Sequence, residues 1–248
     1  DVDKGGHLFA SYLQADFVHS AYRWSGMSDK TSAWLGTAWS FSGQLGFELL
    51  DGHTAQWGVS WYDLLYNTAG SGLFLAQQLH WKEQRIRIKY SIHSVDHPTV
   101  EVPSKNGEQT YPLQDRIRDL YGAGLERFLK DYNGHTVWLS VNPSSFMQHR
   151  DHSIPDWFNI ALGYGAENLY GGFQNKWSAK GQDYEYSLSR NSEWYLSPDI
   201  DLSRIQTDSR LLRTILDLLN VIKVPLPALE YQTDGHWQWH WLSGTVRD

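Results

Sequence analysis

The sequence predicts an α+β protein, with an N-terminal helical bundle packed through small residues and followed by a mainly antiparallel β-rich part. Up to about residue 81, apolar residues recur at the three- and four-residue spacing of helices. From Arg85 onward, short runs of alternating apolar and polar residues are separated by turn residues, which is typical of half-buried strands. We therefore expect a helical region over residues 1–84 and a β-rich region over 85–248, with amphipathic helices near 114–132 and 209–223.

Three helix-like segments make up the first region. The first covers residues 7–24, and the second covers about 31–50, where Gly52 is well placed as a C-terminal stop. The third opens at Ser60, whose hydroxyl can cap it, and continues to about residue 81. The second segment carries small residues at helical spacing, which let neighbouring helices approach closely: Gly36, Ser40, Gly43 and Gly46.

In the second region, residues 94–112 are rich in turn residues and are expected to form a loop. Residues 209–223 carry leucines and isoleucines on one side, as an amphipathic helix does. In the last strand, Trp237, Trp239 and Trp241 share one face, which we expect to be buried. Strands are predicted at residues 85–93, 136–141, 157–164, 184–188, 194–200, 228–231 and 236–242.

Composition excludes some classes of function. A formal net charge of -7 without a cluster of Lys and Arg argues against a nucleic-acid partner. The chain has no cysteine, so any metal must be bound by His, Asp, Glu or Asn. The 13 Trp, 14 Tyr and 9 Phe favour places where one end of a ring is dry and the other wet, such as membrane interfaces and carbohydrate grooves. The start at Asp1, without Met or an apolar leader, fits a processed or trimmed protein.

The candidate site residues lie in pairs one helical turn apart. Asp3 and His7 share one helix face, and so do Glu48 and Asp51. Asp63 repeats the four-residue spacing with Asn67. If the three helices pack together, these carboxylates and one imidazole converge, as in bundle cores that bind metals or catalyse acid/base chemistry. Asp3, His7, Glu48, Asp51 and Asp63 are thus candidate ligands of a divalent metal, with His7, Glu48 and Asp51 as candidate catalytic residues.

Three of these residues also have a structural explanation, whereas Glu48 is the hardest to explain in that way. Asp63 stands three residues after Ser60 and fits the acid of an S-x-x-D capping box. Asp3 fits a helix-start charge, and His7 fits a hydrogen-bonded interior histidine. Glu48 lies late in an apolar helix, where the helix dipole disfavours a negative charge, so it should have a partner.

At these residues the chain resembles the YfiM family of predicted periplasmic lipoproteins. The family's D-K-x-x-H, K-E-x-x-D and G-x-S-W-x-D-L elements correspond here to Asp3, Lys4 and His7, to Glu48 and Asp51, and to Gly58, Ser60, Trp61, Asp63, Leu64, Asn67 and Gly70. Phe47 replaces the family's usual Lys before Glu48. Further runs at 81–86 and 157–166 look like longer, Bacteroidota-type members, so that the resemblance extends over nearly the whole chain. It implies a location in the bacterial cell envelope, periplasmic or associated with the outer membrane, and it implies no activity.

We expect a structural or interaction protein at the periplasmic side of a membrane, with the membrane or an envelope protein as partner and with the polar cluster holding three helices together. The most hydrophobic windows, 34–50 and 61–79, are interrupted by polar residues and are compatible with burial in lipid if their polar groups face one another. One alternative is a metal- or carboxylate-dependent hydrolase of an envelope lipid or glycan, with Glu48 or Asp51 as base and His7 as acid/base or ligand. Another is a small outer-membrane β-barrel with Trp and Tyr girdles.

Overall fold

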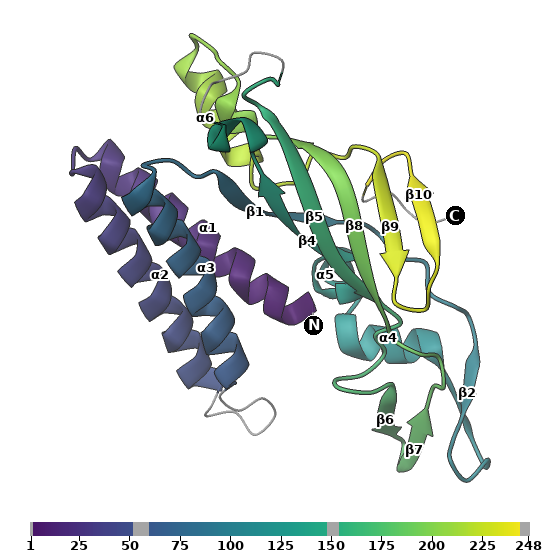
Figure 1. Ribbon diagram of the computed structural model, residues 1–248. Coiled ribbons are helices and arrows are strands. Elements are labelled where there is room, and N and C mark those ends of the chain that lie inside the picture. Colours follow the sequence, from purple (N-terminus) through teal and green to yellow (C-terminus); the bar gives the residue numbers. More distant parts are fainter. Residues whose placement is uncertain (1, 52–59, 148–153, 244–248) are drawn as a thin grey trace. The chain divides into compact units, whose positions relative to one another are not determined.

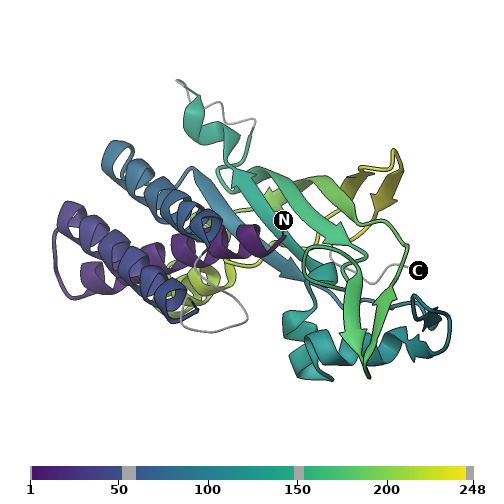
Figure 2. The ribbon, with the colours of Figure 1, turned by 90° about the horizontal axis from the view of Figure 1, so that it is seen from below.

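Three helices occupy the N-terminal third of the chain in the computed structural model, which describes residues 2–51, 60–147 and 154–243. They are α1 (Val2–Trp24), α2 (Asp29–Asp51) and α3 (Trp61–His80). Each of the three contacts the other two, and they lie side by side in both views (Figures 1 and 2). The predicted N-terminal helical bundle is confirmed.

Small residues set the distance between these helices. A Cβ atom on Gly70 of α3 would lie 2.2 Å from the carbonyl oxygen of Leu8 in α1, and one on Gly36 of α2 would lie 2.6 Å from the carbonyl oxygen of Ala15. Only glycine allows backbones to come this close. Not every predicted small residue serves in this way, because a Cβ on Gly46 would meet no atom within 4 Å.

The β-rich part contains a six-stranded sheet with the order β1-β4-β5-β8-β9-β10. The pairs β8–β9 and β9–β10 are antiparallel, as are the two-stranded sheets β2–β3 and β6–β7. The strands are β1 (Ile86–Ile92), β2 (Glu101–Pro103), β3 (Thr110–Pro112), β4 (His135–Val141), β5 (Phe158–Glu167), β6 (Lys176–Ala179), β7 (Gln182–Glu185), β8 (Asn191–Ile200), β9 (Ala228–Gln232) and β10 (Trp237–His240). The predicted α+β class is therefore confirmed.

The helices of this part are shorter than predicted. The single helix expected over 114–132 is two helices, α4 (Leu113–Tyr121) and α5 (Leu125–Lys130), because Gly122 and Gly124 adopt positive φ angles between them. Helix α6 covers Arg210–Leu219. Short 3-10 turns lie at Tyr132–Gly134, Pro143–Phe146 and Leu202–Arg204.

Two other expectations were wrong. The segment 94–112, expected to be a loop, contains the strands β2 and β3. The tryptophan face at the C-terminus is exposed: Trp237 and Trp239 keep more than half of their surface accessible.

The chain divides into two compact units. The first contains residues 1–90, 137–162 and 198–224. The second contains residues 91–136, 163–197 and 225–248. The boundary that the sequence predicts between residues 84 and 85 separates the three N-terminal helices from the first strand. That it is also a boundary between domains stays a prediction. The core of the first unit includes Tyr12, Ala15, Ala33, Phe74, Ile88 and Val137, and that of the second is mainly aromatic: Val102, Tyr111, Leu113, Ile117, Tyr121, Tyr170, Trp177 and Tyr184.

Candidate functional site

The interior of the three-helix region is largely polar. In α2, the buried residues are small or polar: Ser32, Ala33, Gly36, Ser40, Gln44 and Glu48. In α3, the buried set is similar: Asp63, Asn67, Gly70, Ser71, Phe74, Gln77 and Gln78.

Hydrogen bonds inside the first unit satisfy many of these groups. The amide of Gln77 donates to Gln84 Oε1 at 2.9 Å, and that of Gln78 donates to Asp29 Oδ1 at 3.0 Å. Buried polar groups are costly unless they are bonded in this way.

The outward faces of α2 and α3 are apolar. Trp39 of α2 is 63% exposed and Leu65 of α3 is 60% exposed. No charged residue occurs in residues 31–47 or 64–79, so these outer faces carry no charge along most of both helices. This is the reverse of a water-soluble bundle, in which the charged face points outward.

Among the described helices, none combines the length and the apolar character needed to span a lipid bilayer.

A histidine and three acidic residues meet at one end of this polar interior. His7 Nδ1 lies 3.2 Å from Asn67 Oδ1 and 3.8 Å from Glu48 Oε1, while Nε2 lies 3.8 Å from Asp63 Oδ1. The other ring nitrogen, Nε2, faces the Asp63 carboxylate.

Lys4 supplies a positive charge at this point. Its Nζ forms ion pairs with Asp63 Oδ1 and, at 2.9 Å, with Asp3 Oδ2. Burial lowers the pKa of Lys4, but the hydrogen bonds to Asp63 and Asp3 outweigh burial, and the pKa is raised above its ordinary value. Lys4 therefore stays protonated and neutralises part of the negative charge of the two carboxylates that it contacts, those of Asp3 and Asp63.

The capping box at the start of α3 is formed in a modified way. Ser60 Oγ accepts from the Asp63 backbone N–H at 3.3 Å, as predicted. The Ser60 backbone N–H lies 3.5 Å from Glu48 Oε2, so Glu48 stands where the box acid would be. The Asp63 carboxylate is turned toward Lys4 and His7.

Four of the five candidate ligands therefore come together: Asp3, His7, Glu48 and Asp63. Of these, Asp3, His7 and Asp63 each place one ligand atom so that the three atoms lie within 4.8 Å of one another, a set that could hold a metal. The ammonium of Lys4 contacts two of these three groups and competes for the same place. The fifth candidate, Asp51, ends α2, and its side chain lies outside the described residues.

Sequence reasoning missed two features. The first is the role of Lys4, which entered the sequence analysis only as part of the D-K-x-x-H element. Its position next to Asp3 was a signal for the ion pair that the two residues form. The second is a buried charge network in the first unit. Lys89 Nζ lies 2.9 Å from an Asp199 carboxylate oxygen, and Lys223 Nζ lies 3.7 Å from the other. The side chains of all three residues are fully buried. Ser140 Oγ donates to Asp199 at 2.6 Å.

The protonation of Lys223 reflects this burial. Burial lowers the pKa of Lys223 to about 8, with a contribution from the charge of Lys89, although the negative charge of Asp199 acts in the opposite direction. The side chain is out of reach of solvent, so the network is structural.

Comparison with known proteins finds a related family for the N-terminal third of the chain. Neither the curated proteins nor the solved structures yield a match to this chain. The resemblance was expected to continue over nearly the whole chain, but the family match ends within α3. Residues 1–77, which contain the whole polar cluster, match the family described as predicted periplasmic lipoprotein (DUF2279), in agreement with the expected cell-envelope location.

Proposed function

We propose that the protein has a structural or interaction role in the cell envelope and binds to lipid at the periplasmic side of a membrane through the outward faces of α2 and α3. The observation that carries this proposal is the reversed polarity of the helical region, with buried Ser40, Gln44 and Asn67 and exposed Trp39 and Leu65. Each exposed Leu or Phe side chain gains about 2 kcal/mol when it leaves water completely. Several such residues together are enough to hold a protein on a bilayer.

The distribution of residues favours lipid over a protein partner. Protein interfaces usually have a polar rim, whereas the charge-free part of α2 extends for about 25 Å along the helix. Large aromatic residues are exposed near both ends of the antiparallel helices: Trp24 and Trp34 near one end, and Phe47, Trp61 and Tyr62 near the other. Such aromatic belts mark membrane interfaces.

In this proposal the polar cluster holds the three helices together. His7 belongs to α1, Glu48 to α2 and Asp63 to α3, so their contacts connect all three. With many apolar side chains of α2 and α3 turned outward, polar contacts and close backbone packing add to the small apolar core of Tyr12, Ala15, Ala33 and Phe74 in holding the helices to each other.

Flotation with neutral phosphatidylcholine vesicles tests the proposal. The chain of residues 1–248 should float with the vesicles at low salt and at high salt, because apolar burial is not screened. Leu65→Glu combined with Trp39→Glu should abolish flotation. Leu125→Glu, an identical change at an exposed position of α5 in the other unit, should leave it intact. A wild-type chain that stays in the lipid-free fraction, or a double variant that floats like the wild type, would show that these faces do not bind lipid.

A metal-dependent hydrolase is the second candidate, supported by the convergence of Asp3, His7 and Asp63. The His7 side chain keeps 26% of its surface exposed, so a small molecule can reach it. Elemental analysis after dialysis against zinc tests this candidate. A stoichiometric ion that is lost in His7→Ala while the fold is kept would support it, and the same trace metal content in both proteins would argue against it.

A further inference from the structure

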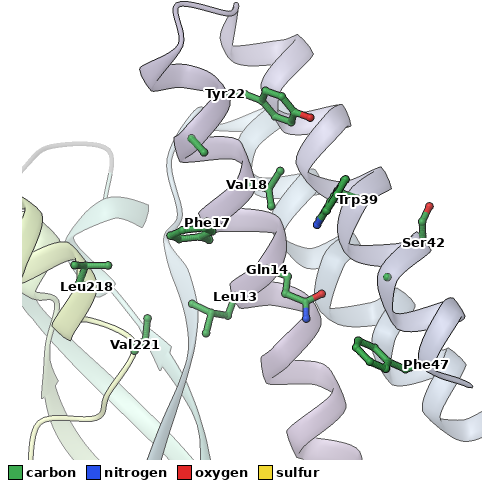
Figure 3. Close-up of a pocket in the computed structure, with 12 residues that line it drawn as sticks. Leu13, Gln14, Phe17, Val18, Tyr22, Trp39, Ser42, Phe47, Leu218 and Val221 are labelled. Carbon is green, nitrogen blue, oxygen red and sulfur yellow. The ribbon is translucent and has the colours of Figure 1, made fainter. Parts of the chain in front are cut away.

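An apolar groove crosses the outside of the helical region. Its floor is α1, one wall is α2, and the other wall is formed by Leu218 near the end of α6 and by Val221, two residues after the helix (Figure 3). All of these segments belong to the first compact unit. The groove has a volume of about 1080 Å³ and is lined mainly by apolar side chains, among them Leu13, Phe17, Trp39, Phe47, Leu218 and Val221.

The α6 wall is fixed by backbone hydrogen bonds. The N–H of Tyr90 in β1 donates to the Val221 carbonyl at 3.0 Å, and the N–H of Lys223 donates to the Tyr90 carbonyl at 2.9 Å. These two bonds hold the segment after α6 on β1. They therefore fix Leu218 and Val221, which form the wall.

We propose that this groove binds a single lipid acyl chain. None of the described residues that line it is charged, and the side chains in this lining that can form hydrogen bonds are those of Gln14, Tyr22, Trp39 and Ser42. A peptide would bring one N–H and one C=O per residue into a place with few partners for them, whereas an acyl chain has no such groups. The volume lies at the upper end of the range for small-molecule pockets, which gives room for a long chain.

The groove also adjoins the surface proposed to contact lipid. Trp39 lines the groove and belongs to the exposed apolar face of α2, so an acyl chain can pass from a bilayer into the groove without crossing a polar rim. Gln14 of α1 lies on the side that faces α2, where its amide can bond to the carboxyl or ester end of the chain (Figure 3). This inference thus rests on the proposed function and adds a defined binding site to it.

Gly43 of α2 offers a way to close the groove. It lines the groove, and the nearest atom to a Cβ placed on it would be Gln14 Oε1 at 3.9 Å, so a larger side chain fits there and projects into the empty space. Gly46 on the same helix also has space for a side chain but does not line the groove. Gly43→Phe and Gly46→Phe are therefore a matched pair.

Equilibrium dialysis with radiolabelled palmitate tests the site. The wild-type chain should bind about one palmitate, Gly43→Phe should weaken binding at least roughly tenfold, and Gly46→Phe should bind like the wild type. Circular dichroism and thermal unfolding check the fold. If Gly43→Phe does not fold, Leu218→Glu in the groove wall takes its place, with Leu211→Glu, exposed on the same helix and outside the lining, as its control.

The outcomes separate this inference from the proposed function. Leu65→Glu alone should weaken flotation with vesicles and keep palmitate binding, because Leu65 does not line the groove. Gly43→Phe should lose palmitate binding and keep flotation. The absence of saturable palmitate binding by the wild-type chain, or equal binding by Gly43→Phe, would overturn the acyl-chain site even if flotation succeeds.

Discussion

The Ser40 hydroxyl donates a 2.7 Å hydrogen bond to the backbone carbonyl of Ser11, and this bond links α2 to α1 in a fully buried place. Serine is among the residues that hold helices together in apolar surroundings, where close packing and polar contacts replace the hydrophobic effect. The same turn of α2 that brings Ser40 inward directs Trp39 outward. At this turn, as along most of α2 and α3, a small or polar residue is buried and a large apolar residue is exposed.

Gly70→Ala should destabilise the helical region. The added Cβ would lie 2.2 Å from the Leu8 carbonyl oxygen, so α1 and α3 must move apart, at a cost of several kcal/mol on the scale of overpacked cores. Gly72→Ala, two residues further along α3 and with no atom within 4 Å, should raise stability by about 1 kcal/mol because alanine favours helix. Thermal unfolding of both variants measures the difference, and similar melting temperatures would contradict the close approach of α1 and α3.

Lys4→Met should remove the positive charge next to Asp3 and Asp63 and lower stability by about 2 kcal/mol. Lys30→Met, at an exposed position of α2, is the control and should have little effect. Because the variant frees the place beside Asp3, His7 and Asp63, zinc should raise its melting temperature more than that of the wild type. An equal zinc response in both proteins would mean that Lys4 does not occupy a cation position.

Stability should depend on pH through Lys223. The pKa of this residue is about 8 in the folded chain and near 10.5 in the unfolded chain, so between these values the unfolded chain binds more protons. Stability should therefore rise with pH in this window, by up to about 1.4 kcal/mol per pH unit. Urea unfolding from pH 7 to 10.5 should show a smaller rise for Lys223→Met than for the wild type. The exposed Lys130→Met is the control, and a slope in Lys223→Met equal to that of the control would contradict the buried, depressed amine.

Ser60→Ala should weaken the start of α3. The variant loses the hydrogen bond from the Asp63 backbone N–H, which typically costs about 1 kcal/mol. Ser209 caps α6 in the same way, through the Leu212 backbone N–H. Since α6 has no buried residue, Ser209→Ala should shift the unfolding midpoint less than Ser60→Ala does. A larger shift for Ser209→Ala would contradict the expectation that the buried helix α3 contributes more to the stability of this unit than α6 does.

The sequence by itself determined the approximate positions of the helices in the N-terminal third, because helical periodicity and the cap at Ser60 act locally, although the first helix begins at Val2 and not at the expected residue 7. It also showed which acidic residues and histidine share a helix face. The ion pair between Lys4 and Asp63 could be found only in the structure, because it depends on how α1 and α3 pack. The same holds for the Lys89–Asp199–Lys223 network, whose members are far apart in the chain.

Only the tertiary structure decided which face of each helix is inside. Periodicity shows that a helix has two different faces, but it does not say which of them turns to the interior, because this depends on the surroundings. In α2 the structure buries the row with Ser40 and Gln44 and exposes the row with Trp39 and Phe47. The physical reason is that Gly36 and Ser40 are small enough for the backbone of α1 to approach, whereas large aromatic side chains on that face would hold the helices apart.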